Sequence, residues 1–162
     1  MGISKKRHWL SLFVLIGATF GASAFGALAA SSSLGSWYHS LEKPAWNPPE
    51  AIFGPVWSVL YLIMAIAAWL VWRRGSENEV IPAMTTYFAQ LVLNVLWPLI
   101  FFGLRAPGWA VFDIVLLWLA IIVAITQFRR VSLAAAWLLA PYLAWVTFAS
   151  VLNITIWRIN EG

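Results

Sequence analysis

The sequence predicts an all-α integral membrane protein, a bundle of five transmembrane helices with a structured first loop rich in proline and tryptophan. Of the 162 residues, 62% are hydrophobic and only 10% are charged. The mean hydropathy of +0.83 lies far above that of soluble globular domains. The apolar residues fall into five runs of roughly 20 residues, which is the length that an α-helix needs to cross a bilayer. These observations favour a single membrane domain over residues 1–162.

The first run covers about residues 10–30 and follows three basic residues, Lys5 to Arg7. A signal peptide is the alternative, because residues 27–29 resemble a cleavage site, but the run exceeds the ordinary apolar core of about 7 to 15 residues. Gly17 and Gly21 give this helix a stripe of small residues that permits close packing. The partner is either a neighbouring helix of the monomer or a second protomer.

The other four runs cover about residues 55–72, 82–102, 109–128 and 133–157. Pro55 stands near the first turn of the second run, where a missing N–H does least harm. Residues 76–80 form a short polar link before the third run, and residues 104–108 form a tight turn before the fourth. The fifth run is expected to be one continuous helix.

The basic residues predict the orientation of the chain. The net charge of +4 arises from Lys and Arg at the ends of the apolar runs, which leaves no basic face for nucleic acid. Counting alternate sides places the N-terminus in the cytoplasm and the first loop outside, by the positive-inside rule. The cytoplasmic side carries Lys5, Lys6, Arg7, Arg73, Arg74, Arg129 and Arg130, and the outer side carries Lys43, Arg105 and Arg158.

The first loop, residues 31–54, is predicted to form a lid. Prolines fix φ and withhold a backbone donor, so they stiffen the path of a loop. They stand here at positions 44, 48, 49 and 55, among three tryptophans of the stretch 37–57. Tyr38, Trp46 and Asn47 are expected to cover a cavity, and Lys43 is either a rim charge for a ligand carboxylate or a solvated side chain.

Three helices each present one face on which aromatic rings alternate with hydrogen-bonding groups. Polar side chains inside a membrane are costly unless paired, so such a face is turned toward protein or a cavity. Amides can simply join helices, at about 1 kcal/mol or less, but flat rings beside single polar anchors suit a planar apolar ligand. The three faces consist of Trp57, Tyr61, Met64 and Ala68; of Gln90, Asn94, Trp97 and Phe101; and of Tyr142, Trp145, Ala149, Leu152 and Asn153.

The sequence offers no recognisable catalytic or metal-binding motif. The chain has no cysteine, and His8 and His39 stand in different regions, so a metal or haem site is not expected and no cofactor is required. Serines, a histidine and a glutamate of the first loop do not suggest a catalytic triad. Chemistry on a bound ligand would depend on light or oxygen, with Trp57 and Trp145 as the candidate redox participants.

Three motifs follow one another along the chain. In the first loop the motif is Trp37-Tyr38-x2-Leu41-x-Lys43-Pro44-x-Trp46-x-Pro48-Pro49, followed by Pro55-x-Trp57. The others are Gln90-Leu91-x2-Asn94-x2-Trp97-x3-Phe101-Phe102 and Pro141-Tyr142-x2-Trp145-x3-Ala149-x2-Leu152-Asn153. These motifs resemble those of the tryptophan-rich sensory protein family, also called the translocator protein or peripheral-type benzodiazepine receptor family (TspO/MBR). The resemblance covers nearly the whole chain, in order and at matching spacing.

The resemblance implies a five-helix bundle, usually a homodimer, that binds porphyrins such as protoporphyrin IX and other flat lipophilic ligands. Bacterial members of the family look like regulators of tetrapyrrole or stress responses. The resemblance therefore implies that this chain is a receptor in a bacterial cell membrane. Porphyrin-degrading enzyme and tetrapyrrole or lipid transporter are the alternatives, although the chain lacks the internal repeats that are common in transporters. The family's ligand-contacting positions correspond to Tyr38, Trp46, Trp57, Asn94, Trp97, Trp145, Ala149 and Leu152.

One residue departs from the family pattern. The sterol motif of the family carries a tyrosine directly after Leu-Asn in the last helix, and this chain has Ile154 there. Sterol binding at that place is therefore not expected.

Overall fold

The computed structural model describes residues 5–34 and 37–161. These residues form α1 (Lys5–Leu34), α2 (Trp37–Ser40), α3 (Glu50–Arg74), α4 (Glu77–Pro98), the π-helix η1 (Leu99–Gly103), α5 (Pro107–Val131), α6 (Leu133–Leu138) and α7 (Ala140–Glu161). Five segments of the described chain are long and apolar enough to cross a membrane: α1, α3, α4 with η1, α5, and α6 with α7. The predicted all-α bundle is confirmed.

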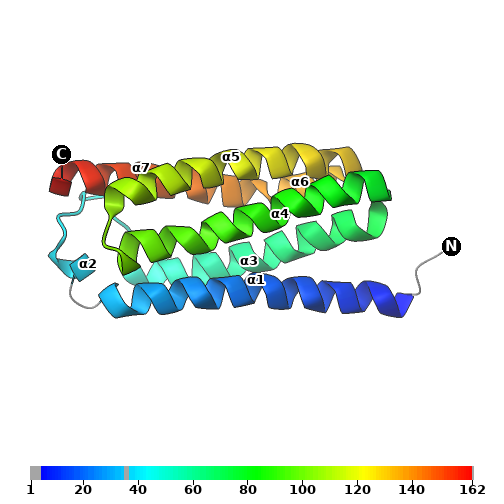
Figure 1. Ribbon diagram of the computed structural model, residues 1–162, viewed down its shortest axis with the longest axis horizontal. Helices are drawn as coiled ribbons and strands as arrows, with labels where there is room; N and C mark the ends of the chain where they lie inside the picture. The colour runs from blue at the N-terminus through cyan, green and yellow to red at the C-terminus, as the bar shows by residue number, and fades with distance from the viewer. Residues whose placement is uncertain (1–4, 35–36, 162) are drawn as a thin grey trace.

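The five spans lie side by side along the long axis and alternate in direction (Figure 1). One end of the bundle carries the start of α1 and the α3–α4 and α5–α6 connections, and the other carries α2 and the C-terminus. Alanines at the centre of α3, such as Ala65, Ala67 and Ala68, are fully buried. Small residues let helix backbones approach closely, which is how helices associate where lipid removes the hydrophobic driving force.

The predicted start of the second span at residue 55 is wrong, because α3 begins at Glu50. Pro49 has φ −56° and ψ 137°, an extended conformation that ends the loop, and the helix starts directly after it. Pro55 therefore lies inside α3 rather than in its first turn. The carboxylate of Glu50 in the first turn complements the positive end of the helix dipole.

The expected polar link before the third span is itself helical. The backbone N–H of Ser76 donates to Oε2 of Glu79 at 2.9 Å, and Oγ of Ser76 donates to the same oxygen at 2.6 Å. The first of these bonds belongs to the capping box of Ser76 and Glu79, whose Ser-x-x-Glu spacing is visible in the sequence. The third span therefore begins at Glu77, before the apolar run from which it was predicted.

The fifth span is two helices, not the single helix that was predicted. α6 ends at Leu138 and α7 begins at Ala140. Pro141 explains the interruption, since proline has no N–H to donate and its ring clashes with the carbonyl four residues earlier. The break precedes Tyr142, which is only 1% exposed in the core.

The α4 helix ends in the five-residue π-helix η1, directly after Pro98. The wider turn is closed by the N–H of Leu104, which donates to the carbonyl of Leu99 at 2.9 Å. π-Helical turns are rare and frequent at functional sites. Here the turn lets the adjacent Phe101 and Phe102 both line the same cavity.

Gly17 and Gly21 are not packed against another helix of the monomer. A Cβ added at either position would meet nothing within 4 Å among the described atoms. No helix of the monomer therefore packs against these two residues, and contact with a second protomer, the other alternative, stays untested.

Among the described glycines, Gly75 has the tightest surroundings, at the connection between α3 and α4. A Cβ there would lie 2.7 Å from Cγ2 of Val80 and 3.2 Å from Cγ1 of Val131. Gly75→Ala is expected to lower the free energy of unfolding by about 1–3 kcal/mol, because overpacking strains a filled site. Detergent-to-SDS titration followed by circular dichroism measures this, and Gly103→Ala, with open space at its Cβ, is the control. Equal stability of the two variants would contradict the steric argument.

Candidate functional site

A cavity of about 470 Å³ lies inside the bundle, and Tyr38 and Glu50 bring the region of the first loop into its lining. Its volume is in the range typical of small-molecule sites. Nine of the predicted ligand-binding residues line it: Tyr38, Trp57, Tyr61, Asn94, Trp97, Phe101, Trp145, Ala149 and Leu152. Both redox candidates, Trp57 and Trp145, are in this set. Their predicted contact with a ligand stays a prediction.

The α3 wall of the cavity is a pair of stacked rings. The ring centroids of Trp57 and Tyr61 are 5.3 Å apart, with an interplanar angle of 27°. Trp57 also meets the ring of Tyr142 edge-on at 6.3 Å. These contacts orient the indole of Trp57, so one wall of the cavity is a flat aromatic surface.

A chain of hydrogen bonds joins three helices behind this wall. The hydroxyl of Tyr61 donates to Oδ1 of Asn94, and Nδ2 of Asn94 donates to the hydroxyl of Tyr142 at 2.9 Å. Tyr142 in turn donates to Oε1 of Gln90 at 2.7 Å. Asn94 therefore lines the cavity and also joins helices, whereas Gln90 is bonded in the core and is not a lining residue.

The opposite wall is held by a second amide. The indole Nε1 of Trp97 donates to Oδ1 of Asn153 at 2.9 Å, and Nδ2 of Asn153 donates to the carbonyl of Pro107 at 3.0 Å. The ring of Trp97 stacks on Phe101, with centroids 5.1 Å apart. This network fixes α4, η1, α5 and α7 around the cavity.

Trp145 carries a polar atom without a partner. Its Nε1 is buried and has no hydrogen bond to any described residue. A buried donor without an acceptor is costly, so this N–H is available to an acceptor atom on a ligand in the cavity that Trp145 lines.

Tyr38 connects the first loop to the cavity. It is only 4% exposed and meets Phe102 edge-on at 5.5 Å. Burial raises the pKa of its phenol, and the negative charge of Glu50 raises it further, while the nearby side chain of Asn47 lowers it. Nζ of Lys43 lies 4.5 Å from the centre of the Tyr38 ring. Tyr38 is therefore a neutral hydrogen-bonding group at physiological pH.

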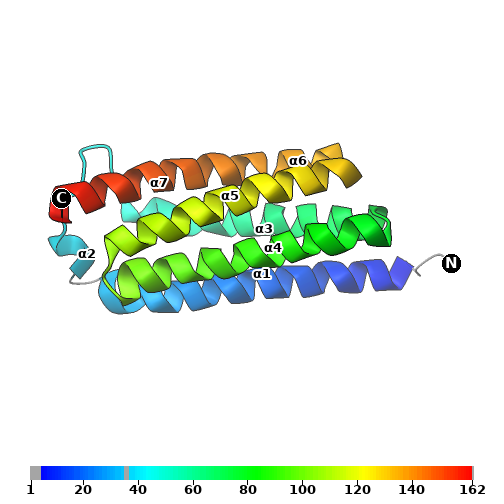
Figure 2. The ribbon, with the colours of Figure 1, turned by 45° about the horizontal axis from the view of Figure 1, so that its top comes forward.

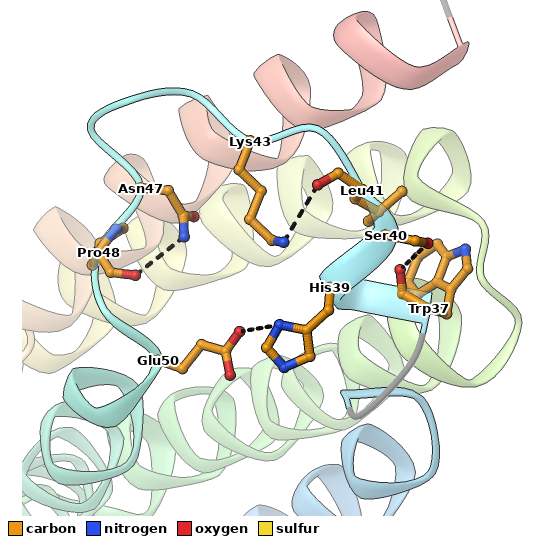
Figure 3. Close-up of polar contacts among 8 residues, drawn as sticks. All are labelled: Trp37, His39, Ser40, Leu41, Lys43, Asn47, Pro48 and Glu50. Atoms are coloured by element: carbon orange, nitrogen blue, oxygen red, sulfur yellow. Dashed lines mark hydrogen bonds and ion pairs between the residues drawn. The ribbon is translucent and has the colours of Figure 1, made fainter.

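The structure does not bring Trp46 and Asn47 into the cavity lining. Trp46 is 47% exposed and packs edge-on against Phe148 at 5.9 Å. Nδ2 of Asn47 donates to the neighbouring carbonyl of Pro48 at 3.1 Å (Figure 3). These two residues shape the loop in this structure, and their contact with a ligand stays a prediction.

The first loop is fastened to the end of α7, beside which it lies in Figure 2. Asn160 accepts from the backbone N–H of Glu42 and donates to its carbonyl, both at 3.0 Å. Two bonds between one side-chain amide and both backbone groups of Glu42 fix the position of the loop. Sequence reasoning had no signal for this pair, because its members are far apart in the chain.

Sequence reasoning also missed part of the lining. α1 contributes small residues, α5 contributes aliphatic ones, and the start of α3 contributes an acid and a ring. The small-residue stripe of α1 was the available signal, but it did not indicate a cavity. The residues are Ser23, Gly26, Ala27, Ala30, Glu50, Phe53, Ile114 and Leu117. Within the described chain, no group of three or more His, Asp or Glu could hold a metal ion.

The fold and the cavity define a multi-pass membrane protein with an aromatic, ligand-sized site inside a five-helix bundle. The TspO/MBR family model matches residues 12–158, and the chain belongs to this family.

Three relatives that align with most of this chain come from very different organisms. The "Tryptophan-rich protein TspO" of Chlorobaculum tepidum is 42% identical over 157 residues, 96% of this chain and 99% of its own length. The "Translocator protein" of Sus scrofa is 39% identical over 152 residues, 91% of this chain and 90% of its own. The "Tryptophan-rich sensory protein" of Cereibacter sphaeroides is 35% identical over 141 residues, 85% and 87% of the two chains.

Proposed function

We propose that the chain is a membrane receptor that binds porphyrins and other flat lipophilic molecules in the cavity and regulates tetrapyrrole or stress responses. The cavity itself carries the proposal: about 470 Å³ lined by Trp57, Trp97 and Trp145 with few polar groups. A planar aromatic ligand stacks favourably on indole faces, and Asn94 and the free N–H of Trp145 offer polar anchors. The names of relatives, "tryptophan-rich sensory protein" among them, agree with a sensory role.

The proposal includes an orientation. The end with the first loop faces outside and the N-terminus faces the cytoplasm of a bacterial cell, because most Lys and Arg stand at the other end of the bundle. Ligands then reach the cavity from the outer side. A homodimer belongs to the same proposal, with the open stripe at Gly17 and Gly21 as a candidate contact.

Titration of the detergent-purified protein with protoporphyrin IX tests the binding site. The Soret absorbance of the porphyrin is followed, so that removal of a tryptophan does not disturb the signal. Trp57→Ala is expected to weaken binding about tenfold, which is ~1.4 kcal/mol, because it removes a wall of the cavity. Trp137→Ala is the matched control, since Trp137 is 69% exposed and is not among the lining residues.

Equal affinity in the Trp57→Ala variant and the parent would place porphyrin elsewhere and refute this site. Weakening by both tryptophan variants alike would indicate non-specific adsorption on exposed aromatic rings. Specific binding in the cavity is supported only when Trp57→Ala weakens the affinity for porphyrin and Trp137→Ala leaves it unchanged.

A further inference from the structure

The cavity has one charged group among its described lining residues, the carboxylate of Glu50. Glu50 is the first residue of α3 and lies with Tyr38 at the end of the cavity that the first loop covers. We call this the loop end. The rest of the lining is apolar, aromatic or uncharged polar, so Glu50 supplies the one charge among the described lining residues.

The group that faces the carboxylate of Glu50 is the imidazole of His39, and both side chains are partly exposed, 44% for Glu50 and 59% for His39. Nδ1 of His39 lies 3.6 Å from Oε1 of Glu50, and the two side chains point toward each other in Figure 3. Nζ of Lys43 is engaged elsewhere, with the carbonyl of Leu41 at 3.4 Å and the ring of Tyr38. In the described part of the chain, no Lys or Arg forms an ion pair with Glu50.

The field of Glu50 reaches the cavity wall. Tyr38 lines the cavity, and the charge of Glu50 contributes to the raised pKa of its phenol, second in effect among the raising causes after burial. A ligand edge beside Tyr38 would experience the same field. An anionic group at that position is disfavoured, and a hydrogen-bond donor is favoured.

We propose that Glu50 is a specificity-determining residue of the cavity. It selects flat apolar ligands whose edge at the loop end is uncharged or donates hydrogen bonds, and it discriminates against a ligand carboxylate there. A ligand that carries carboxylates is expected to bind with them turned away from Glu50. This inference rests on the proposed function, because it assigns the ligand class of the same cavity.

A simpler role for Glu50 is to complement the dipole of α3, whose cap Pro49 makes no side-chain hydrogen bond. That role predicts a loss of helix stability but no preference between ligands of different charge. Glu77 is the matched comparison, since it is also an acid in the first turn of a span, in α4. Both side chains are exposed, but Glu77 is not among the cavity-lining residues.

The experiment compares protoporphyrin IX with its dimethyl ester, which has the same ring and no carboxylates. Both are titrated at pH 7.5 into the parent protein, Glu50→Gln and Glu77→Gln. Glu50→Gln is expected to raise the affinity for the acid relative to the ester about two- to fivefold, the size of an interaction between partly exposed charges. The Glu77→Gln variant keeps the parent's ratio.

The salt dependence of the acid-to-ester affinity ratio is a second measurement, and a purely structural role of Glu50 would not change this ratio. At about 1 M salt the screening length falls to about 3 Å, so the acid-to-ester ratio of the parent approaches that of Glu50→Gln. An unchanged ratio in Glu50→Gln, or an equal gain for acid and ester, overturns the inference. If Trp57→Ala weakens the binding of neither ligand, porphyrins do not bind in this cavity. That result refutes the proposed function, and the inference about Glu50 with it.

Discussion

Replacing Ala149 with phenylalanine is expected to abolish porphyrin binding while the bundle remains folded. Ala149 lines the cavity from α7, so an added ring occupies the space that a flat ligand needs. A porphyrin and the new phenyl ring cannot both fit in a cavity of about 470 Å³. The close-packed side chains around the cavity move too little to make room for both. The affinity should fall about a hundredfold or more, which is ~2.7 kcal/mol. Titration with protoporphyrin IX followed by Soret absorbance measures the loss.

Ala144→Phe is the matched control for this prediction. It makes the same change on the same helix, but Ala144 is exposed on the outer surface of the bundle. Its affinity for porphyrin should equal that of the parent. Retained binding in Ala149→Phe, with native circular dichroism, would show that the ligand does not enter the cavity.

Tyr142 is the residue whose removal should cost the most stability. It is 1% exposed, and its hydroxyl links Asn94 on one side to Gln90 on the other. Tyr142→Phe removes two interhelical hydrogen bonds and should cost about 1–2 kcal/mol, because such bonds contribute modestly in membranes. Tyr142→Ala also leaves a void and should cost about 3–5 kcal/mol.

The contrast between the two Tyr142 variants separates hydrogen bonding from packing. Unfolding by SDS in mixed micelles, followed by circular dichroism, gives both free energies. Phe112→Ala is the control, since Phe112 is 62% exposed and its loss should change stability by less than about 0.5 kcal/mol. A Tyr142→Phe variant as unstable as Tyr142→Ala would mean that the polar network, rather than packing, holds α4 and α7 together.

Much of the site could be predicted because a helix has a fixed period. Residues three or four apart share a face, so Asn94, Trp97 and Phe101 had to lie together once the span was recognised as a helix. The structure turns that face and those of Trp57 and Trp145 into one cavity. The three polar-aromatic faces were visible in the sequence because polar side chains inside a membrane must be turned away from lipid.

Loop geometry could not be predicted in the same way. The first loop has no period, and its position depends on Asn160, more than a hundred residues away in sequence and bonded to Glu42. That contact belongs to a loop that holds Trp46 against Phe148 rather than in the cavity lining. The prolines indicated a stiff loop backbone, but they did not indicate where the loop lies relative to the helices.

The sequence by itself determined the class of protein, the five spans and the residues that share a face on each helix, because hydropathy and helical period are local properties. Only the tertiary structure decided that Asn94 is bonded between Tyr61 and Tyr142 and that Trp145 has a free N–H. It also placed the carboxylate of Glu50 at the loop end of the cavity. The physical reason is that a hydrogen bond or a field depends on which helices meet and at what rotation. Those are set by packing between residues that are distant in the chain.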